Sequence, residues 1–156
     1  MAPNGQGPGE FACMVQVGLI SDTHGLLRKE ALQALAGSEL IIHAGDVGRA
    51  EILAALSEIA PVIAVRGNVD RGAFSEALPK SAITDAGDLR IFVIHNLAEL
   101  ILDPAQAGFK AVVFGHSHKP SRNQKNGVLF INPVIPSPGL SRVSDGTRRE
   151  SPQNGP

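Results

Sequence analysis

The sequence predicts an α/β fold, and three observations support this class. A length of 156 residues suits one domain with a sizeable buried core. Short apolar runs alternate with amphipathic, helix-like segments as far as residue 70. Carboxylate and imidazole side chains follow several of the apolar runs, and open α/β sheets bind their ligands at the carboxyl ends of their strands.

The first half of the chain predicts three strands separated by two helices. The run at 15–20 and those within 39–46 and 61–68 are short, apolar and bounded by polar or glycine residues, as buried strands are. Segments 26–37 and 49–61 carry apolar residues at helical spacing, ending at a glycine and a proline respectively. This β-α-β-α-β order favours a parallel sheet with helices packed against it.

The second half predicts a different arrangement. Residues 81–95 read as two strands around a Gly-Asp turn, hence an antiparallel hairpin. Residues 103–109 are expected to form a short helix with Pro104 in its first turn. Two further strands are expected within 110–115 and 127–132.

The two ends of the chain are predicted to lie outside the domain. Residues 1–13 read as a flexible leader without the features of a secretory signal, and residues 14–133 as the folded domain. Residues 134–156 are rich in proline, glycine, serine and charge, and are expected to be an atypical, disordered tail.

Composition narrows the function classes. A net charge of −1 gives no electrostatic support for nucleic acid as a partner. No apolar run approaches the roughly 20 residues that span a membrane. Cys13 is the single cysteine, which excludes an internal disulfide and suits a reducing compartment. The expected location is therefore the cytoplasm.

Seven potential metal ligands follow the predicted strands, and they include four of the five histidines: Asp22, His24, Asp46, Asn68, His95, His116 and His118. Aspartate and neutral imidazole are good ligands for manganese, iron or zinc, and an asparagine oxygen is a weaker one. Seven donors are too many for one tetrahedral zinc and suit two ions that share a carboxylate. Taken singly, Asp22 could cap the following helix, Asp46 suits a turn, and His95 could be a structural strand-end histidine.

The ordered motifs D-T-H-G, G-D, G-N-x-D, H and G-H-S-H resemble the calcineurin-like metallophosphoesterase superfamily, in particular its small bacterial and archaeal phosphodiesterase branch. The resemblance extends from about residue 15 to Pro133. It implies two packed mixed β-sheets flanked by helices, an α/β/β/α sandwich with metals at the strand ends. By this resemblance, Asp22, His24 and His118 hold one divalent ion and Asn68, His95 and His116 a second, with Asp46 bridging the two.

The resemblance also implies an activity. It predicts a phosphodiesterase in which a hydroxide bridging two divalent ions attacks phosphorus, with Asp46, Asn68 and His95 as catalytic residues. Manganese is the expected metal, with iron, zinc or nickel as alternatives, and the expected partner is a small phosphorylated substrate. A homo-oligomer is left open. The alternative function is a non-catalytic protein-interaction scaffold, since a retromer-type branch keeps the fold and has lost ligands; the complete ligand set argues against it.

Two departures from the family pattern bear on these expectations. Many relatives have a histidine after the asparagine of G-N, where this chain has Val69. Without that general acid, diesters or esters with acidic leaving groups are the expected substrates. The second departure is the sequence after Pro133, which lacks the pattern of a final strand. Three more residues near the motifs are weaker candidates for supporting the site or contacting substrate: His43, Asp70 and Arg66.

Overall fold

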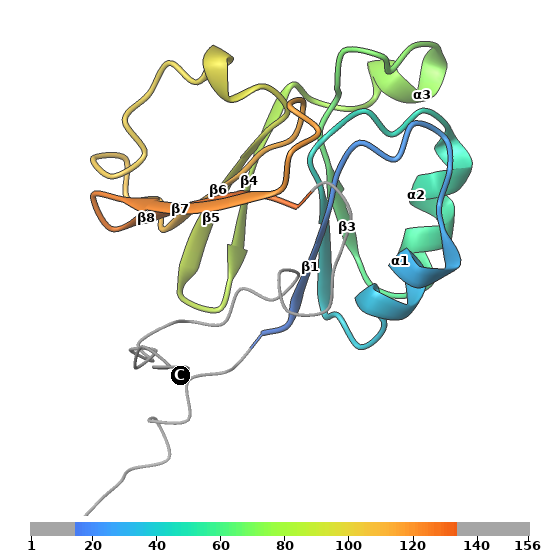
Figure 1. Ribbon diagram of the computed structural model, residues 1–156, viewed down its shortest axis with the longest axis horizontal. Coiled ribbons are helices and arrows are strands. Elements are labelled where there is room, and N and C mark those ends of the chain that lie inside the picture. Colours follow the sequence, from blue (N-terminus) through green and yellow to red (C-terminus); the bar gives the residue numbers. More distant parts are fainter. Residues whose placement is uncertain (1–14, 134–156) are drawn as a thin grey trace, which may run out of the picture.

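Two β-sheets packed against each other form the centre of the protein in the computed structural model, which describes residues 15–133 (Figure 1). The first sheet contains β1 (Val17–Ile20), β2 (Leu40–His43) and β3 (Val62–Ala64) in that order. Both of its pairings are parallel, as the alternating strand and helix pattern predicts. Helices α1 (Lys29–Leu35) and α2 (Ala50–Ser57) connect these strands. The predicted β-α-β-α-β order with a parallel sheet is therefore confirmed.

The second sheet is mixed and has the strand order β4-β5-β6-β8-β7. Its members are β4 (Ser81–Ala86), β5 (Leu89–Ile94), β6 (Ala111–Val113), β7 (Ser121–Lys125) and β8 (Val128–Asn132). The β4–β5 pair is the antiparallel hairpin that the sequence predicts. Strand β6 lies parallel to both β5 and β8, while β7 pairs antiparallel with β8 at the edge.

The main core lies between the two sheets. Alternate residues of β1 and β5, such as Leu19, Ile91 and Val93, point into it and are fully buried. Helices α1 and α2 cover the outer face of the first sheet, where Leu35 and Leu56 pack against Ile41 (Figure 1). This burial holds the three strand ends of the first sheet in fixed relative positions.

The outer face of the second sheet is covered by the segment between β5 and β6. Phe92 and Val112 of the sheet pack against Phe109 from this segment, which also contains a short 3-10 helix, η1 (Leu97–Glu99). The helix predicted for 103–109 is wrong, because these residues form turns instead. Gly108 adopts a left-handed φ of 87°, which ends any helical run before Phe109.

Besides η1, two elements have no counterpart in the sequence-based prediction. The short helix α3 (Ala73–Glu76) follows the third strand, and β7 forms one edge of the second sheet. Strand β7 reads Ser-Arg-Asn-Gln-Lys and is largely exposed, so it lacks the apolar alternation that reveals a strand. The predicted leader and tail lie outside the described residues. None of the helices in residues 15–133 is long and apolar enough to cross a membrane.

Candidate metal centre

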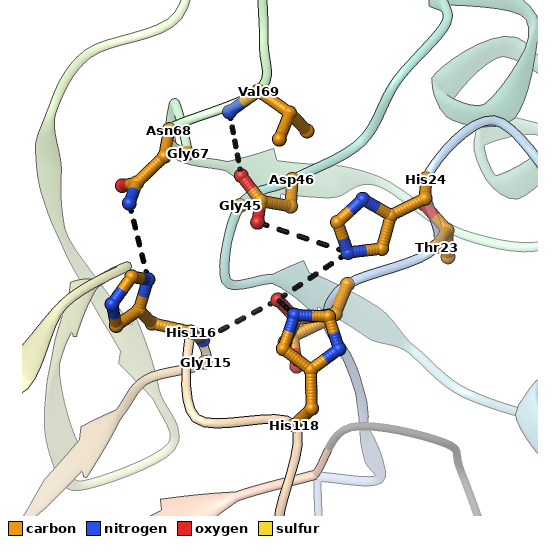
Figure 2. Close-up of polar contacts among 12 residues, drawn as sticks. Thr23, His24, Gly45, Asp46, Gly67, Asn68, Val69, Gly115, His116 and His118 are labelled. Atoms are coloured by element: carbon orange, nitrogen blue, oxygen red, sulfur yellow. Dashed lines mark hydrogen bonds and ion pairs between the residues drawn. The ribbon is translucent and has the colours of Figure 1, made fainter.

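Loops that follow strands of both sheets bring the seven predicted ligands to one place. Figure 2 shows five of them together: His24, Asp46, Asn68, His116 and His118. Asp22 and His24 follow β1, Asp46 follows β2, and Asn68 follows β3. His95 comes directly after β5, and the histidines of G-H-S-H follow β6. Strands β1, β2, β3, β5 and β6 therefore all direct their carboxyl ends toward this region, so residues nearly a hundred positions apart come into contact.

Four of these side chains form a compact cluster. One ligand atom from each of Asp22, His24, Asp46 and His118 lies within 4.8 Å of the others. The Oδ1 atom of Asp22 is 3.7 Å from His118 Nε2 and 4.0 Å from His24 Nε2. Its other oxygen accepts a hydrogen bond from the Ser21 hydroxyl at 2.7 Å, so the carboxylate is held with one oxygen toward the histidines. The sequence shows no sign of this role for Ser21.

The Asp46 carboxylate, which belongs to this cluster, also faces His95, one of the remaining ligands. Its Oδ2 atom is 3.8 Å from His24 Nε2 on one side and 3.2 Å from His95 Nε2 on the other. Its Oδ1 atom accepts a hydrogen bond from the Val69 amide at 3.0 Å. One oxygen therefore faces both groups of ligands, and the backbone fixes the orientation of the carboxylate.

His95 is buried and has one ring nitrogen without a hydrogen-bond partner. Its Nδ1 lies 2.7 Å from the Ala44 carbonyl oxygen, which can only accept, so Nδ1 carries a hydrogen. In a neutral ring, Nε2 then presents a lone pair, and among the described residues this buried atom has no hydrogen-bond partner. A lone pair 3.2 Å from a carboxylate oxygen is unfavourable by itself and becomes favourable when both atoms coordinate one cation.

Asn68 and His116 complete the arrangement. The Asn68 side-chain amide lies 3.2 Å from His116 Nδ1, and the His116 ring meets that of His95 edge to face at 5.3 Å between centroids. The His116 backbone amide donates to Asp22 Oδ1 at 3.3 Å, which joins this group to the four-residue cluster.

The backbone at this site is conformationally strained. The described residues with positive φ other than glycine are Asp22, His24, Asp46, His116, His118 and Asn126. Five of these six are predicted metal ligands, with φ between 49° and 75°. Such conformations cost on the order of 1–3 kcal/mol each and persist where the surrounding structure holds them, which is typical of functional sites.

Three glycines next to the ligands allow the backbone to approach them closely. A Cβ atom on Gly45 would lie 2.6 Å from His95 Nδ1, and one on Gly115 would lie 2.7 Å from Asp22 Oδ2. A Cβ on Gly67 would overlap the Asp46 backbone nitrogen and carboxylate. Any larger residue at these positions would displace a predicted ligand.

Asp70 holds two of the ligand loops together. It is buried, and its carboxylate accepts hydrogen bonds from the backbone amides of Gly48 at 2.9 Å and Gly67 at 2.8 Å. These amides belong to the loops that carry Asp46 and Asn68. Asp70 therefore contacts the loops and no predicted ligand side chain directly.

His43 is buried in the protein, whereas Arg66 is partly exposed. His43 is fully buried beneath the ligand loops, and burial lowers the pKa of its ring from 6.5 to about 4. Arg66 is half-buried, and its guanidinium forms no hydrogen bond or ion pair with any residue in the 15–133 range. The contact with substrate suggested for Arg66 therefore stays a prediction.

A supporting residue that the sequence analysis missed is Asn132, at the end of β8. Its side chain is buried and donates hydrogen bonds to the Gly115 carbonyl at 3.2 Å and to Ser117 Oγ at 2.9 Å. These bonds hold the turn that carries His116 and His118. Its position at the end of an apolar strand gives no signal of this role.

The donor set fits divalent metal ions. Two carboxylates, four imidazoles and one amide converge, and a buried imidazole nitrogen faces a carboxylate oxygen in the manner expected of a shared cation site. The structural alternative suggested for Asp22 does not hold. Helix α1 begins at Lys29 with Arg28 as its N-cap, so Asp22 does not cap it.

Sequence comparison identifies the family. The model of the calcineurin-like phosphoesterase superfamily domain matches residues 15–138, and the chain belongs to this superfamily. A "Probable metallophosphoesterase" of Methanocaldococcus jannaschii is 34% identical over 134 residues, which cover 78% of this chain and 68% of that protein. Another of the same description, from Methanothermobacter thermautotrophicus, is 30% identical over 141 residues, covering 83% of this chain and 80% of that protein. The chain is thus a member of a family of metal-dependent phosphoesterases.

Solved structures agree on the fold. Vacuolar protein sorting 29 from Cryptosporidium parvum superposes with a TM-score of 0.67 at 24% identity, covering 78% of this chain and 75% of that one. An archaeal phosphodiesterase superposes with a TM-score of 0.64 at 24% identity, covering 77% of this chain and 84% of that one. At these identities the likeness establishes the two-sheet fold alone.

Proposed function

We propose that this protein is a phosphodiesterase that depends on two divalent metal ions, with manganese as the native metal and iron, zinc or nickel as alternatives. Asp22, His24 and His118 would hold one ion, and Asn68, His95 and His116 the other. Asp46 would bridge the two ions. The substrate is a small phosphorylated molecule, and the expected location is the cytoplasm. Family membership supports the hydrolase class, and the geometry of the ligands supports the finer assignment.

The observation that carries this proposal is the position of Asp46 Oδ2. This oxygen faces His24 Nε2 at 3.8 Å and the buried, unpartnered His95 Nε2 at 3.2 Å. A carboxylate shared between two ligand groups is what a two-metal site needs, because each ion requires negative charge and the ions repel each other.

Ions bound there would supply Lewis acidity that lowers the pKa of water and neutralises the charge of a phosphate group. The residues of the chain act by position. Asp46 Oδ1 accepts a hydrogen bond from the Val69 amide, and His95 Nδ1 donates one to the Ala44 carbonyl. These bonds fix the directions in which Asp46 Oδ2 and His95 Nε2 point. Asn68, His116 and His118 are exposed, so this side of the site is open to a substrate.

The residues near the site also favour a class of leaving group. Val69 has no titratable group where many relatives have histidine, and its side chain is 45% exposed. His43 does not replace it, because that ring is 0% exposed and both of its nitrogens are occupied by Thr23 and Gly45. A leaving group that needs no protonation is therefore expected, and a missing general acid costs poor leaving groups roughly 10²- to 10⁴-fold in rate.

The test is hydrolysis of a series of aryl and alkyl phosphodiesters and monoesters by metal-depleted protein to which Mn²⁺, Fe²⁺, Zn²⁺, Ni²⁺ or Mg²⁺ is added. We expect metal-dependent turnover that rises as the pKa of the leaving group falls, with diesters preferred. Asp46→Asn should abolish this turnover. Asp85→Asn is the matched control, since the Asp85 side chain is 62% exposed on β4 and should leave turnover unchanged.

The alternative is a scaffold that binds proteins and does not turn over substrate. Its support is the likeness to vacuolar protein sorting 29, which extends to the fold alone. Purified protein that carries metal but hydrolyses none of the esters, with or without added ions, would favour the scaffold. Efficient hydrolysis of simple alkyl esters would instead contradict the assigned leaving-group preference.

A further inference from the structure

A buried histidine and a threonine connect the loops that carry three of the proposed ligands. His43 is the last residue of β2 and is 0% exposed. Its Nε2 atom lies 2.9 Å from the hydroxyl of Thr23, which stands between Asp22 and His24 in the loop after β1. Its Nδ1 atom lies 3.2 Å from the backbone nitrogen of Gly45, the residue before Asp46.

The directions of these hydrogen bonds follow from the chemistry of the partners. The Gly45 amide can only donate, so His43 Nδ1 accepts and the ring carries its hydrogen on Nε2. The Thr23 hydroxyl lies 2.9 Å from the Val47 carbonyl, which can only accept, so Thr23 donates to it. His43 Nε2–H must then donate to the Thr23 oxygen. Each group in this chain of hydrogen bonds has one defined role.

The chain of hydrogen bonds begins and ends on the two sides of Asp46. It runs from the Gly45 amide through His43 and Thr23 to the Val47 carbonyl. It therefore ties the Asp46 loop to the loop that carries Asp22 and His24. All three ligands have left-handed φ values between 49° and 56°, so their loops need such ties to keep this conformation.

Backbone hydrogen bonds also join these loops. The amides of Asp22, His24 and Gly25 donate to the carbonyls of residues 45, 46 and 47 at 2.8 to 3.0 Å. The Thr23 hydroxyl is the side-chain group that contacts both the Val47 carbonyl and His43. Removing it would leave the His43 donor and the Val47 acceptor buried or half-buried without this partner.

We propose that Thr23 and His43 are positioning residues that hold Asp22, His24 and Asp46 in ligand geometry through one directed chain of hydrogen bonds. Neither side chain points a free polar atom at the ligands' shared centre, so their effect is transmitted through the loops. This inference rests on the proposed metal site and not on the identity of the substrate.

The test compares Thr23→Val, which removes the hydroxyl at nearly constant volume, with Thr23→Ser, which keeps it. The probes are Mn²⁺ and Co²⁺, measured by titration calorimetry and by the visible absorption of bound Co²⁺. We expect Thr23→Val to bind both ions roughly 10- to 100-fold more weakly and to alter the Co²⁺ spectrum, as changes to groups that orient ligands do. Thr23→Ser should restore the affinity and the spectrum to nearly the wild-type values.

A matched control and a second variant keep the test decisive. Thr84→Val makes the same change on β4, where the threonine side chain forms no hydrogen bond to any residue of the described chain, and should bind metal as the wild type does. If Thr23→Val does not fold, Thr23→Ala removes the same hydroxyl without placing a methyl group against the Val47 carbonyl. Melting curves of the metal-free proteins establish that the compared variants are folded.

Kinetics separate this inference from the proposed function. With an aryl phosphodiester and subsaturating Mn²⁺, Thr23→Val should lower kcat and leave KM for the ester nearly unchanged, because Thr23 does not touch the substrate. Wild-type metal affinity and an unchanged Co²⁺ spectrum in both hydroxyl-free variants would overturn the inference. If Thr23→Val binds metal more weakly than the wild type, and the wild type itself hydrolyses no ester, the inference is supported and the proposed phosphodiesterase activity is refuted.

Discussion

Replacing Gly45 with alanine should disable the metal site through His95. A Cβ atom at position 45 would lie 2.6 Å from His95 Nδ1, 2.8 Å from its Cγ and 2.9 Å from its Cβ. The ring cannot move away freely, because it is buried and its Nδ1 is bonded to the Ala44 carbonyl at 2.7 Å. The added methyl group must therefore shift either the ring or the loop that carries Asp46.

The expected loss of stability in Gly45→Ala has two parts, backbone strain and steric overlap. The φ of 98° at Gly45 costs an alanine about 1–2 kcal/mol. Overlap with a side chain that cannot yield adds about 1–3 kcal/mol. We therefore expect Gly45→Ala to lower the free energy of unfolding by roughly 2–5 kcal/mol. Because the displaced group is a proposed ligand, metal affinity should fall by roughly 10- to 100-fold or more.

Gly108→Ala is a control that separates backbone strain from steric overlap with His95. Gly108 has a similar φ of 87°, but a Cβ there would meet no atom within 4 Å. It should lose about 1–2 kcal/mol from backbone strain and keep the metal affinity of the wild type. Urea unfolding of the metal-free proteins and calorimetric titration with Mn²⁺ measure both quantities. If Gly45→Ala binds Mn²⁺ like Gly108→Ala, the reasoning from the close approach to His95 is refuted.

Two further predictions concern the groups that support the site. Asp70→Asn should lower the free energy of unfolding by about 1.5–3 kcal/mol. The amides of Gly48 and Gly67 bond to different oxygens of the Asp70 carboxylate, and the substitution turns one of these oxygens into an NH2 group that cannot accept. Urea unfolding checks this, and Asp85→Asn, which should be neutral, is the control. Burial lowers the pKa of His43 from 6.5 to about 4, so the unfolded chain takes up a proton at a higher pH than the folded protein. The stabilising contribution of neutral His43 is therefore complete above pH 6.5 and is lost as the pH falls toward 4, by about 3 kcal/mol in all. Unfolding measurements in a chelator should show that His43→Asn loses less stability than the wild type over this pH range, and parallel pH curves would contradict the prediction.

The order of strands and the types of residues that follow them could be predicted from the sequence. Apolar runs and helical spacing depend on neighbouring residues, so β1, α1, β2, α2 and β3 were recognisable, as was the β4–β5 hairpin. The seven candidate ligands stood out for the same reason, since each follows an apolar run of the sequence. The polar strand β7 and the turns at 103–109 escaped prediction, because their conformation depends on pairing and packing with distant parts of the chain.

The distances within the site were decided by tertiary structure. Packing of one sheet on the other brings Asp46 Oδ2 within 3.2 Å of His95 Nε2, although the two residues come from different sheets. The left-handed φ of Asp22, His24 and Asp46 and the connection from Thr23 through His43 also depend on contacts between separate loops. A sequence pattern specifies which side chains leave the end of each strand. Only the packed core fixes how far apart those ends lie, because burial between the sheets sets their relative position to a fraction of a side chain's length.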